Sequence, residues 1–163
     1  DHLIIRTNFF GWSSGRKMSF AEWLYQALEE EQPVTLFDDF FFSPIYVGDL
    51  AERLVLLVDG GHRGLFHLGG KDRISKYRFG ELLAAEAGLS MQAVTRGSIE
   101  NARLRAPRPK DMSLSSAHFE TVAGVEVPGC SDGLRRFVEE RGRSLAHCLD
   151  SGQPVTLKSS SPE

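Results

Sequence analysis

The stretch Leu36-Phe37-Asp38-Asp39-Phe40-Phe41-Phe42-Ser43-Pro44-Ile45-Tyr46-Val47-Gly48-Asp49-Leu50-Ala51 joins a strand pattern to a helix pattern through an aromatic loop. Val34 to Phe37 is typical of a short strand, and Asp49 is a candidate cap for a helix that ends at Gly60-Gly61. Burying one phenylalanine ring contributes roughly 1.5–3 kcal/mol, so exposing Phe40 to Phe42 would be costly. This triplet must therefore face a core, a partner subunit or a pocket.

A second apolar run, Leu3 to Thr7, ends at Asn8. Its aliphatic and β-branched residues predict a strand buried on both faces, as in a parallel sheet. The loop that follows, Phe9 to Gly15, contains the aromatic residues Phe9, Phe10 and Trp12. Because ligands of open α/β sheets bind at the carboxyl ends of the strands, these aromatics are candidate pocket walls.

Strand and helix patterns alternate along the rest of the chain. Ser19 and Glu22 form a capping-box pattern that begins one helix, and Ser75 begins another that ends before Gly88. The alternation predicts an α/β fold that contains only part of a doubly wound sheet. The remaining predicted elements are strands at Gly64 to Leu68 and Met91 to Thr95, a short helix from Ser115 to Ala123 and a longer helix from Ser131.

The composition is that of a soluble globular protein. Of the 163 residues, 41% are hydrophobic and 25% are charged, and this length favours one compact unit. The formal net charge of −3 and the pI near 6.0 give no basic footprint, so we expect neither nucleic acid nor an acidic membrane surface as a partner. The apolar runs are shorter than the roughly 20 residues that span a bilayer, which predicts a protein without a membrane span.

The two cysteines, Cys130 and Cys148, lack C-x-x-C spacing, so we expect neither a disulfide framework nor a metal site. Cysteines without such a framework favour a reducing cytoplasm. The chain starts at Asp1 rather than at Met, and an apolar strand pattern follows at once, which indicates a cut at the N-terminus. A mature protein that begins with an edge strand is the alternative.

The residues of a standalone nucleotide-dependent enzyme are missing from this sequence. A nucleotide cofactor normally needs a glycine-rich turn between a strand and a helix, and no G-x-G-x-x-G occurs. Carbonyl reduction also needs a proton donor, commonly a Tyr with a Lys one helical turn later. Tyr25, Tyr46 and Tyr77 lack that Lys, and Lys76 directly precedes Tyr77, so those two side chains would not face each other. We therefore assign no catalytic residue.

Three segments together resemble one known family: Ile5 to Trp12, Phe42 to Ala51, and Arg108 to Leu114. In order and spacing they are similar to dTDP-4-dehydrorhamnose reductases, extended short-chain dehydrogenases that reduce sugar nucleotides with NADPH or NADH. The similarity covers about residues 2–142 and corresponds to the second half of the family's chain. It implies the C-terminal part of a doubly wound Rossmann-like sheet plus the small substrate-binding subdomain at residues 1–147, followed by a polar tail at 148–163.

The resemblance also implies ligands and the residues that would contact them. The cofactor would be NADPH or NADH, and the substrate a nucleotide sugar, although the family's glycine-rich turn and Tyr-x-x-x-Lys pair do not occur in this sequence. The residues that would lie against the cofactor are Thr7, Asn8 and Phe9. The residues that would contact the substrate are Asn8, Trp12, Phe42, Pro44, Tyr46 and Arg108, and the guanidinium fork of the last suits diphosphate oxygens.

Some of these residues have a plainer interpretation. An asparagine such as Asn8 commonly caps a helix or a turn, and an arginine such as Arg108 is commonly solvated at the surface. Core packing is an equally good explanation for Phe42. In addition, Asp39-Phe40 departs from the Asp-Gln pattern expected in the family, which leaves the sugar itself undetermined.

Two functional hypotheses follow. In the first, the chain is the substrate-binding half of an NAD(P)H-dependent reductase of dTDP-4-dehydro-6-deoxy sugars and is inactive alone. In the second, it is a non-catalytic binding or regulatory module of the same fold, such as the regulatory subunit of methionine adenosyltransferase. A half-sheet exposes a strand edge, so we also expect a homodimer or association with the missing N-terminal half.

Overall fold

The computed structural model describes residues 2–13, 17–102, 106 and 108–151, with side chains described as far as residue 142. Within these residues the helices are α1 (Phe20–Glu29), α2 (Val47–Asp59), α3 (Lys76–Ala87), η1 (Ile99–Asn101, a 3-10 turn), α4 (Ala117–Ala123) and α5 (Cys130–Ser151). The strands are β1 (Leu3–Thr7), β2 (Phe9–Phe10), β3 (Val34–Phe37), β4 (Phe41–Phe42), β5 (Ile45–Tyr46), β6 (Gly64–Leu68), β7 (Ile74–Ser75) and β8 (Val94–Gly97).

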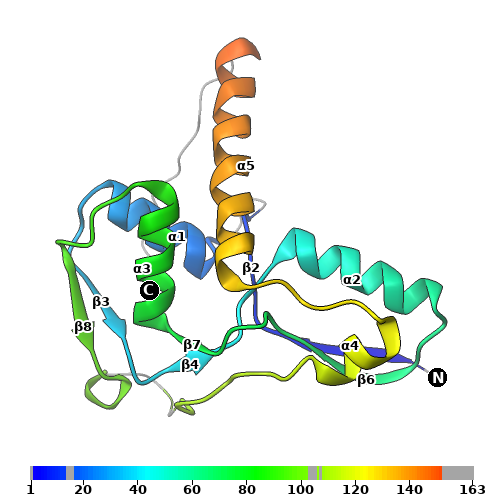
Figure 1. Ribbon diagram of the computed structural model, residues 1–163. Helices are drawn as coiled ribbons and strands as arrows, with labels where there is room; N and C mark the ends of the chain where they lie inside the picture. Colours follow the sequence, from blue (N-terminus) through cyan, green and yellow to red (C-terminus); the bar gives the residue numbers. More distant parts are fainter. Residues whose placement is uncertain (1, 14–16, 103–105, 107, 152–163) are drawn as a thin grey trace.

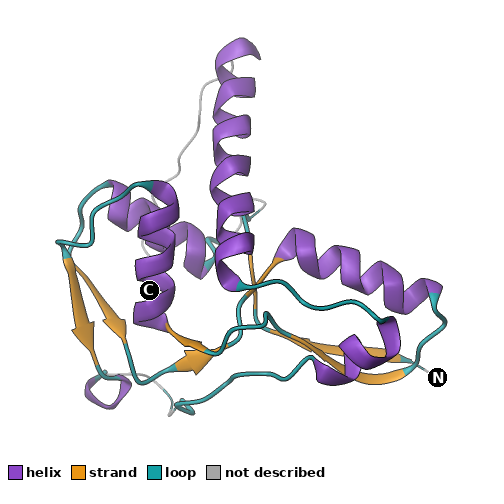
Figure 2. Cartoon of the chain, in the orientation of Figure 1, coloured by secondary structure: helices purple, strands orange, loops and turns teal. Residues whose placement is uncertain are grey.

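The elements form two lobes that meet near the start of α5 (Figure 1). One lobe contains α1, α3, β3 and β8, and its core includes Leu24, Phe79 and Phe137. The other lobe contains α2, α4, β1 and β6, and its core includes Phe66 and Phe119. Short strands and loops connect the two lobes, and the C-terminal part of α5 projects away from both (Figure 2).

The strands pair two at a time. The pairs β1–β6, β2–β5 and β3–β8 are parallel, and the short pair β4–β7 is antiparallel. Parallel strands need long crossover connections, here supplied by helices, and this arrangement confirms the predicted α/β class.

The β1–β6 ladder corrects one expectation about burial. Leu3 and Ile5 pack against the core around Phe66, but Ile4 is 56% exposed and its ladder neighbour Leu65 is 44% exposed. The prediction that β1 is buried on both faces is therefore wrong for this chain. One face of the ladder is covered, and the other presents adjacent aliphatic side chains to solvent.

Local sequence signals located several helix ends correctly. The hydroxyl of Ser19 accepts the Glu22 N–H over 3.2 Å, and the Glu22 carboxylate accepts the Ser19 N–H over 3.0 Å, which confirms the predicted capping box. Gly88 ends α3 with a φ of 66°, a left-handed conformation that favours glycine. By contrast, Asp49 does not cap α2, because the helix already begins at Val47.

Other boundaries shift by a few residues. The last predicted strand lies at Val94–Gly97 rather than at residues 91–95, and α4 and α5 begin at Ala117 and Cys130. Helix α5 continues into the predicted tail as far as Ser151, and residues 152–163 lie outside the described part of the chain. No helix in the described part is long and apolar enough to cross a membrane. The same residues contain no cluster of three or more His, Cys, Asp or Glu side chains that could hold a metal ion.

Candidate functional site

Ser43 connects the three segments that carry the family resemblance. Its N–H donates to Oδ1 of Asn8 over 3.3 Å, and its carbonyl accepts the Gly70 N–H over 3.1 Å. Its buried hydroxyl accepts the Leu114 N–H over 3.2 Å. Asn8 and Gly70 follow the paired strands β1 and β6, so these hydrogen bonds lie at the carboxyl end of the ladder, where α/β sheets bind ligands.

The residues predicted to contact a cofactor have different environments. Asn8 is a structural tie, because its carbonyl also accepts the Ile45 N–H over 3.1 Å and its Nδ2 donates to the Thr7 carbonyl over 3.4 Å. The Oγ1 atom of Thr7 is buried and has no hydrogen-bond partner among the described residues. Phe9 is 61% exposed. Among the described residues, Thr7 therefore has a hydroxyl without a hydrogen-bond partner, and Phe9 has a solvent-exposed ring.

A cavity of about 370 Å³ opens beside the aromatic loop. Phe20 and Trp23 of α1 and Phe40 of the loop form aromatic walls, and Lys76 and Arg108 supply two cations. Among the described residues that line it, none carries a carboxylate. Aromatic walls with two cations suit a ligand that combines a flat or apolar ring with negative charge.

Lys76 is the first residue of α3 and is fixed there by backbone contacts. Its N–H donates to the Phe40 carbonyl over 3.1 Å, which ties the helix to the aromatic loop. Its Nζ lies 3.6 Å from the ring centroid of Phe42 and 3.8 Å from that of Phe20. Burial disfavours the charged form and lowers the pKa of Lys76 to about 7. Near neutral pH this amine is therefore close to balance between its charged and uncharged forms.

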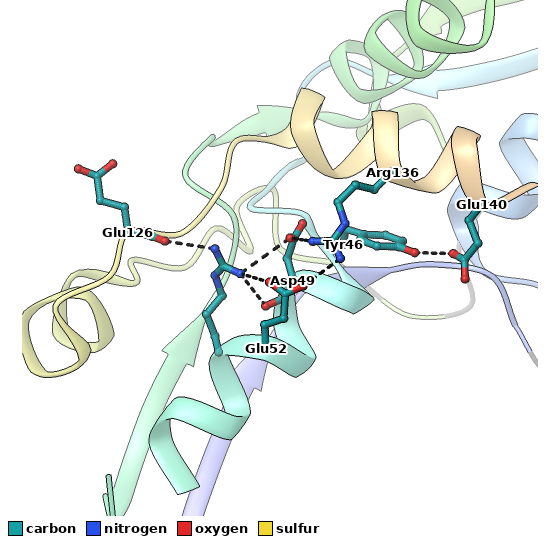
Figure 3. A network of polar contacts seen from close by, with 7 residues as sticks. Tyr46, Asp49, Glu52, Glu126, Arg136 and Glu140 are labelled. Atoms are coloured by element: carbon teal, nitrogen blue, oxygen red, sulfur yellow. Dashed lines mark hydrogen bonds and ion pairs between the residues drawn. The ribbon is translucent and has the colours of Figure 1, made fainter. Parts of the chain in front are cut away.

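Tyr46 belongs to a polar network that joins β5 and α2 to α5 (Figure 3). Its hydroxyl donates to the Glu140 carboxylate, and the guanidinium of Arg136 lies 5.2 Å from the centroid of its ring. Burial, reinforced by Glu140, raises the pKa of Tyr46 to about 12. A tyrosine held in this way is a poor proton donor near neutral pH.

Asp49 lies at the centre of the same network and pairs with Arg136 (Figure 3). Arg53 lies 3.8 Å from the same carboxylate. Arg136 also donates to Glu52 over 3.0 Å, and Arg53 donates to the Glu126 carbonyl over 3.4 Å. Burial raises the pKa of the Asp49 carboxyl, and the two guanidinium groups oppose that shift. The arrangement explains why the Asp49 carboxylate serves as an ion-pair partner between α2 and α5 and not as a helix cap.

Trp12 and Phe10 pack inside the first lobe. Trp12 stacks on Phe137 with 4.2 Å between ring centroids, and its indole N–H donates to the Phe137 carbonyl over 2.9 Å. Phe10 is 4% exposed and meets Phe79 edge to face at 5.3 Å. Phe10 is therefore a core residue, and the expectation that it forms a pocket wall is wrong.

Phe42 and Pro44 are also buried. Phe42 packs against Phe79 in the core, and its ring also contacts the Nζ atom of Lys76, a cavity residue. The Pro44 carbonyl oxygen would lie only 2.1 Å from a Cβ atom added to Gly70, so that close approach requires a glycine. Of the predicted substrate residues, the structure brings Arg108 to the cavity, and it builds Asn8, Trp12, Phe42, Pro44 and Tyr46 into the surrounding framework.

Sequence reasoning missed Lys76 and Phe20 as cavity residues. Lys76 did carry a signal, because a lysine at the first position of a helix lies against the positive end of the helix dipole. The first turn of α3 contains no acidic residue that would offset this. Phe20 gives no such signal, since its helical spacing with Trp23 and Leu24 is typical of ordinary core packing.

Residues 1–142 match the family model described as the RmlD substrate binding domain. The spore coat polysaccharide biosynthesis protein SpsK of Bacillus subtilis is 29% identical over 141 residues, which are 86% of this chain and 48% of that protein. The dTDP-4-dehydrorhamnose reductase of Mycobacterium tuberculosis is 34% identical over 93 residues, which are 56% of this chain and 30% of that protein. The matched part of the chain thus corresponds to about half the length of SpsK. It corresponds to a smaller share of the mycobacterial protein.

A solved structure shares the fold. The dTDP-4-dehydrorhamnose reductase of Bacillus anthracis, in complex with NADP, matches with a TM-score of 0.76 at 23% identity, over 85% of this chain and 48% of that one. The fold is α/β and of the Rossmann-like class. The chain belongs to the RmlD substrate-binding domain family, and the resemblance inferred from its three segments is confirmed.

Proposed function

We propose that this chain is the substrate-binding part of an NAD(P)H-dependent reductase that acts on dTDP-4-dehydro-6-deoxy sugars. The cavity beside the aromatic loop carries the proposal, because its aromatic walls and two cations suit the ring and the diphosphate of a nucleotide sugar. The family match and the similarity to a dTDP-4-dehydrorhamnose reductase favour the same substrate class. Nothing in the described residues favours the regulatory-subunit alternative, so we propose no second function.

Arg108 is the residue that we propose to contact the substrate directly. Arg108 is a lining residue of the cavity, and its segment is tied to the rest of the site through the hydrogen bond between Leu114 and Ser43. Asn8, Pro44 and the other buried residues of the framework would act indirectly, by holding these walls in a fixed geometry. Such support matters because a binding site that is loose by about 1 Å loses much of its effect.

The nicotinamide cofactor would lie against Thr7, Asn8 and Phe9. The fit is reasonable, because Thr7 has a buried hydroxyl without a partner in the described chain and Phe9 exposes an aromatic face. When bound, NADPH or NADH supplies the hydride for carbonyl reduction. The glycine-rich turn and the Tyr-x-x-x-Lys pair do not occur in this sequence, so other residues must hold the diphosphate of the cofactor and donate the proton.

An apolar strip on the β1–β6 ladder supports association with a partner. Ile4 and Leu65 are neighbours in the ladder and are both exposed. Parallel sheets are normally covered on both faces, so this strip would be buried against the cofactor-binding half of a reductase or against a second copy of this chain.

Thermal melting of the 163-residue chain with dTDP-glucose tests the function. A ligand that binds only the folded state stabilises it by about 2.7 kcal/mol at one hundred times its Kd, which would raise the melting temperature by several degrees. NADPH alone should give a smaller rise, because this sequence lacks the glycine-rich turn. Absence of any shift with dTDP-glucose would contradict the proposal, and so would turnover of a dTDP-4-keto sugar by this chain without another protein.

A further inference from the structure

Lys76 is a basic side chain without an acidic partner in the described structure. Its Nζ contacts aromatic rings instead, at 3.6 Å from the centroid of Phe42, 3.8 Å from that of Phe20 and 5.8 Å from that of Phe40. Cation–π contacts of this kind recover part of the free energy that a cation loses when it leaves water. The ammonium is thus held in place by rings while its hydrogen-bond donors stay available.

The described lining of the cavity provides no anionic side chain to pair with Lys76. Its cavity also contains Arg108, and the described lining residues include no carboxylate. The nearby Asp39 is already engaged, since it accepts hydrogen bonds from the Ser98 hydroxyl and the Ile99 N–H and pairs with Lys110 at 3.4 Å. An anionic ligand in this cavity could pair with both basic side chains.

We infer that Lys76 is a binding residue for the diphosphate of a nucleoside diphosphate sugar, acting together with Arg108, which lines the same cavity. The inference rests on the proposed function and adds a residue to it. A diphosphate carries two negative charges in a short span, which matches two cations on one cavity, while the rings around Lys76 can pack against the base or the sugar.

This assignment makes ligand binding depend on pH. The pKa of the free Lys76 amine is near 7, and a bound diphosphate would raise it, so binding takes up a proton above that pH. Arg108 is the other charged residue among the described lining of the cavity. Neither phosphate of a nucleotide sugar titrates near neutral pH, unlike a terminal phosphate, whose second pKa is about 6.

Calorimetric titration of the full chain and three variants tests the inference. Lys76→Met removes the charge and keeps the length among the rings, and Lys76→Arg restores a charge. Lys71→Met is the matched control, because Lys71 is an exposed lysine paired with Glu126 at 2.9 Å outside the cavity. The probes are dTDP-glucose, measured at about pH 6 and pH 8.5, and inorganic pyrophosphate, and a thermal melt of each variant verifies folding.

We expect Lys76→Met to weaken dTDP-glucose binding by about tenfold or more, because one charge-assisted hydrogen bond is lost. Lys71→Met should leave the affinity for dTDP-glucose unchanged. Lys76→Arg should keep most of the wild-type affinity. Wild-type binding should weaken about tenfold between the two pH values, and Lys76→Met should remove that dependence. Equal binding of dTDP-glucose by the wild type and a folded Lys76→Met variant would overturn the inference and leave the proposed function standing.

Pyrophosphate separates the inference from the proposed function. If the wild type binds pyrophosphate through Lys76 but does not bind dTDP-glucose, the anion-binding role is supported and the nucleotide-sugar function fails. If the wild type binds neither probe, both are overturned.

Discussion

The side-chain oxygen Oδ1 of Asn8 accepts the backbone N–H of Ser43 over 3.3 Å and thereby ties the end of β1 to the aromatic loop. Ser43 itself is 2% exposed, so its N–H has no access to water. The same loop carries Phe40, which lines the cavity, and Phe42, whose ring contacts Lys76. A single side-chain amide thus links the strand end with the segment on which the binding site depends.

Asn8→Ala should destabilise the chain by about 1–3 kcal/mol, because a buried N–H would lose its acceptor. Asn8→Asp keeps an oxygen at the same position and should cost less. Urea unfolding followed by circular dichroism measures both, and Asn101→Ala, at an exposed position in η1, is the control with an expected effect within about 0.5 kcal/mol. If Asn8→Ala were as stable as the wild type, the tie would have no energetic role.

Local sequence patterns predicted much of the fold because the interactions that decide it are local. The capping box of Ser19 and Glu22 spans one helical turn, and Gly88 ends its helix through its own backbone conformation. Hydrogen bonds such as that between Ser43 and Leu114, 71 positions apart, are set by tertiary packing and leave no trace in a sequence window. The family resemblance identified the segments that contain Ser43 and Leu114, but it did not predict the hydrogen bond between these two residues.

The candidate site was less predictable for the same reason. Arg108 was recognised through the resemblance, but Lys76 reaches the cavity because the antiparallel pairing of β4 with β7 brings the start of α3 beside the phenylalanine triplet. Asp49 looked like a helix cap, and its partner Arg136 lies 87 positions away. Pairings at such distances have no counterpart in helical or strand periodicity.

The stability of the chain should rise with pH above neutrality because of Lys76. Burial lowers its folded-state pKa to about 7, whereas an unfolded lysine titrates near 10.4. Between these values the unfolded chain binds more protons at this site, so raising the pH favours the folded state by up to about 1.4 kcal/mol per pH unit. Below pH 7 both states are protonated and the contribution is constant.

Urea unfolding of the wild type and Lys76→Met at about pH 7 and pH 9 measures this effect. The gain of the wild type between the two pH values should exceed that of the variant by about 2 kcal/mol. Lys76→Met should also be the more stable protein at pH 7, because it places no charge among the rings. Identical pH dependence in the two proteins would show that Lys76 titrates like an exposed lysine.

The ion pair between Arg136 and Asp49 should stabilise the junction of α2 with α5. Arg136→Met leaves a carboxylate that is 5% exposed with one guanidinium partner fewer, and we expect a loss of about 1–3 kcal/mol. Arg135→Met is a matched control at the neighbouring position of α5, since among the described residues Arg135 forms an exposed pair with Asp132 at 3.6 Å. Chemical denaturation should separate the two variants, and equal effects would contradict a specific role for Asp49.

The central claim is that a nucleotide sugar binds in the cavity beside the aromatic loop, and the two tryptophans of the chain test it most directly. Trp23 lines that cavity, whereas Trp12 is stacked on Phe137 in the core. Titration of dTDP-glucose into Trp12→Phe, in which Trp23 is the remaining reporter, should change the tryptophan fluorescence. The same titration of Trp23→Phe should leave the signal of Trp12 unchanged, and a response from Trp12 alone, or from neither variant, would contradict the account.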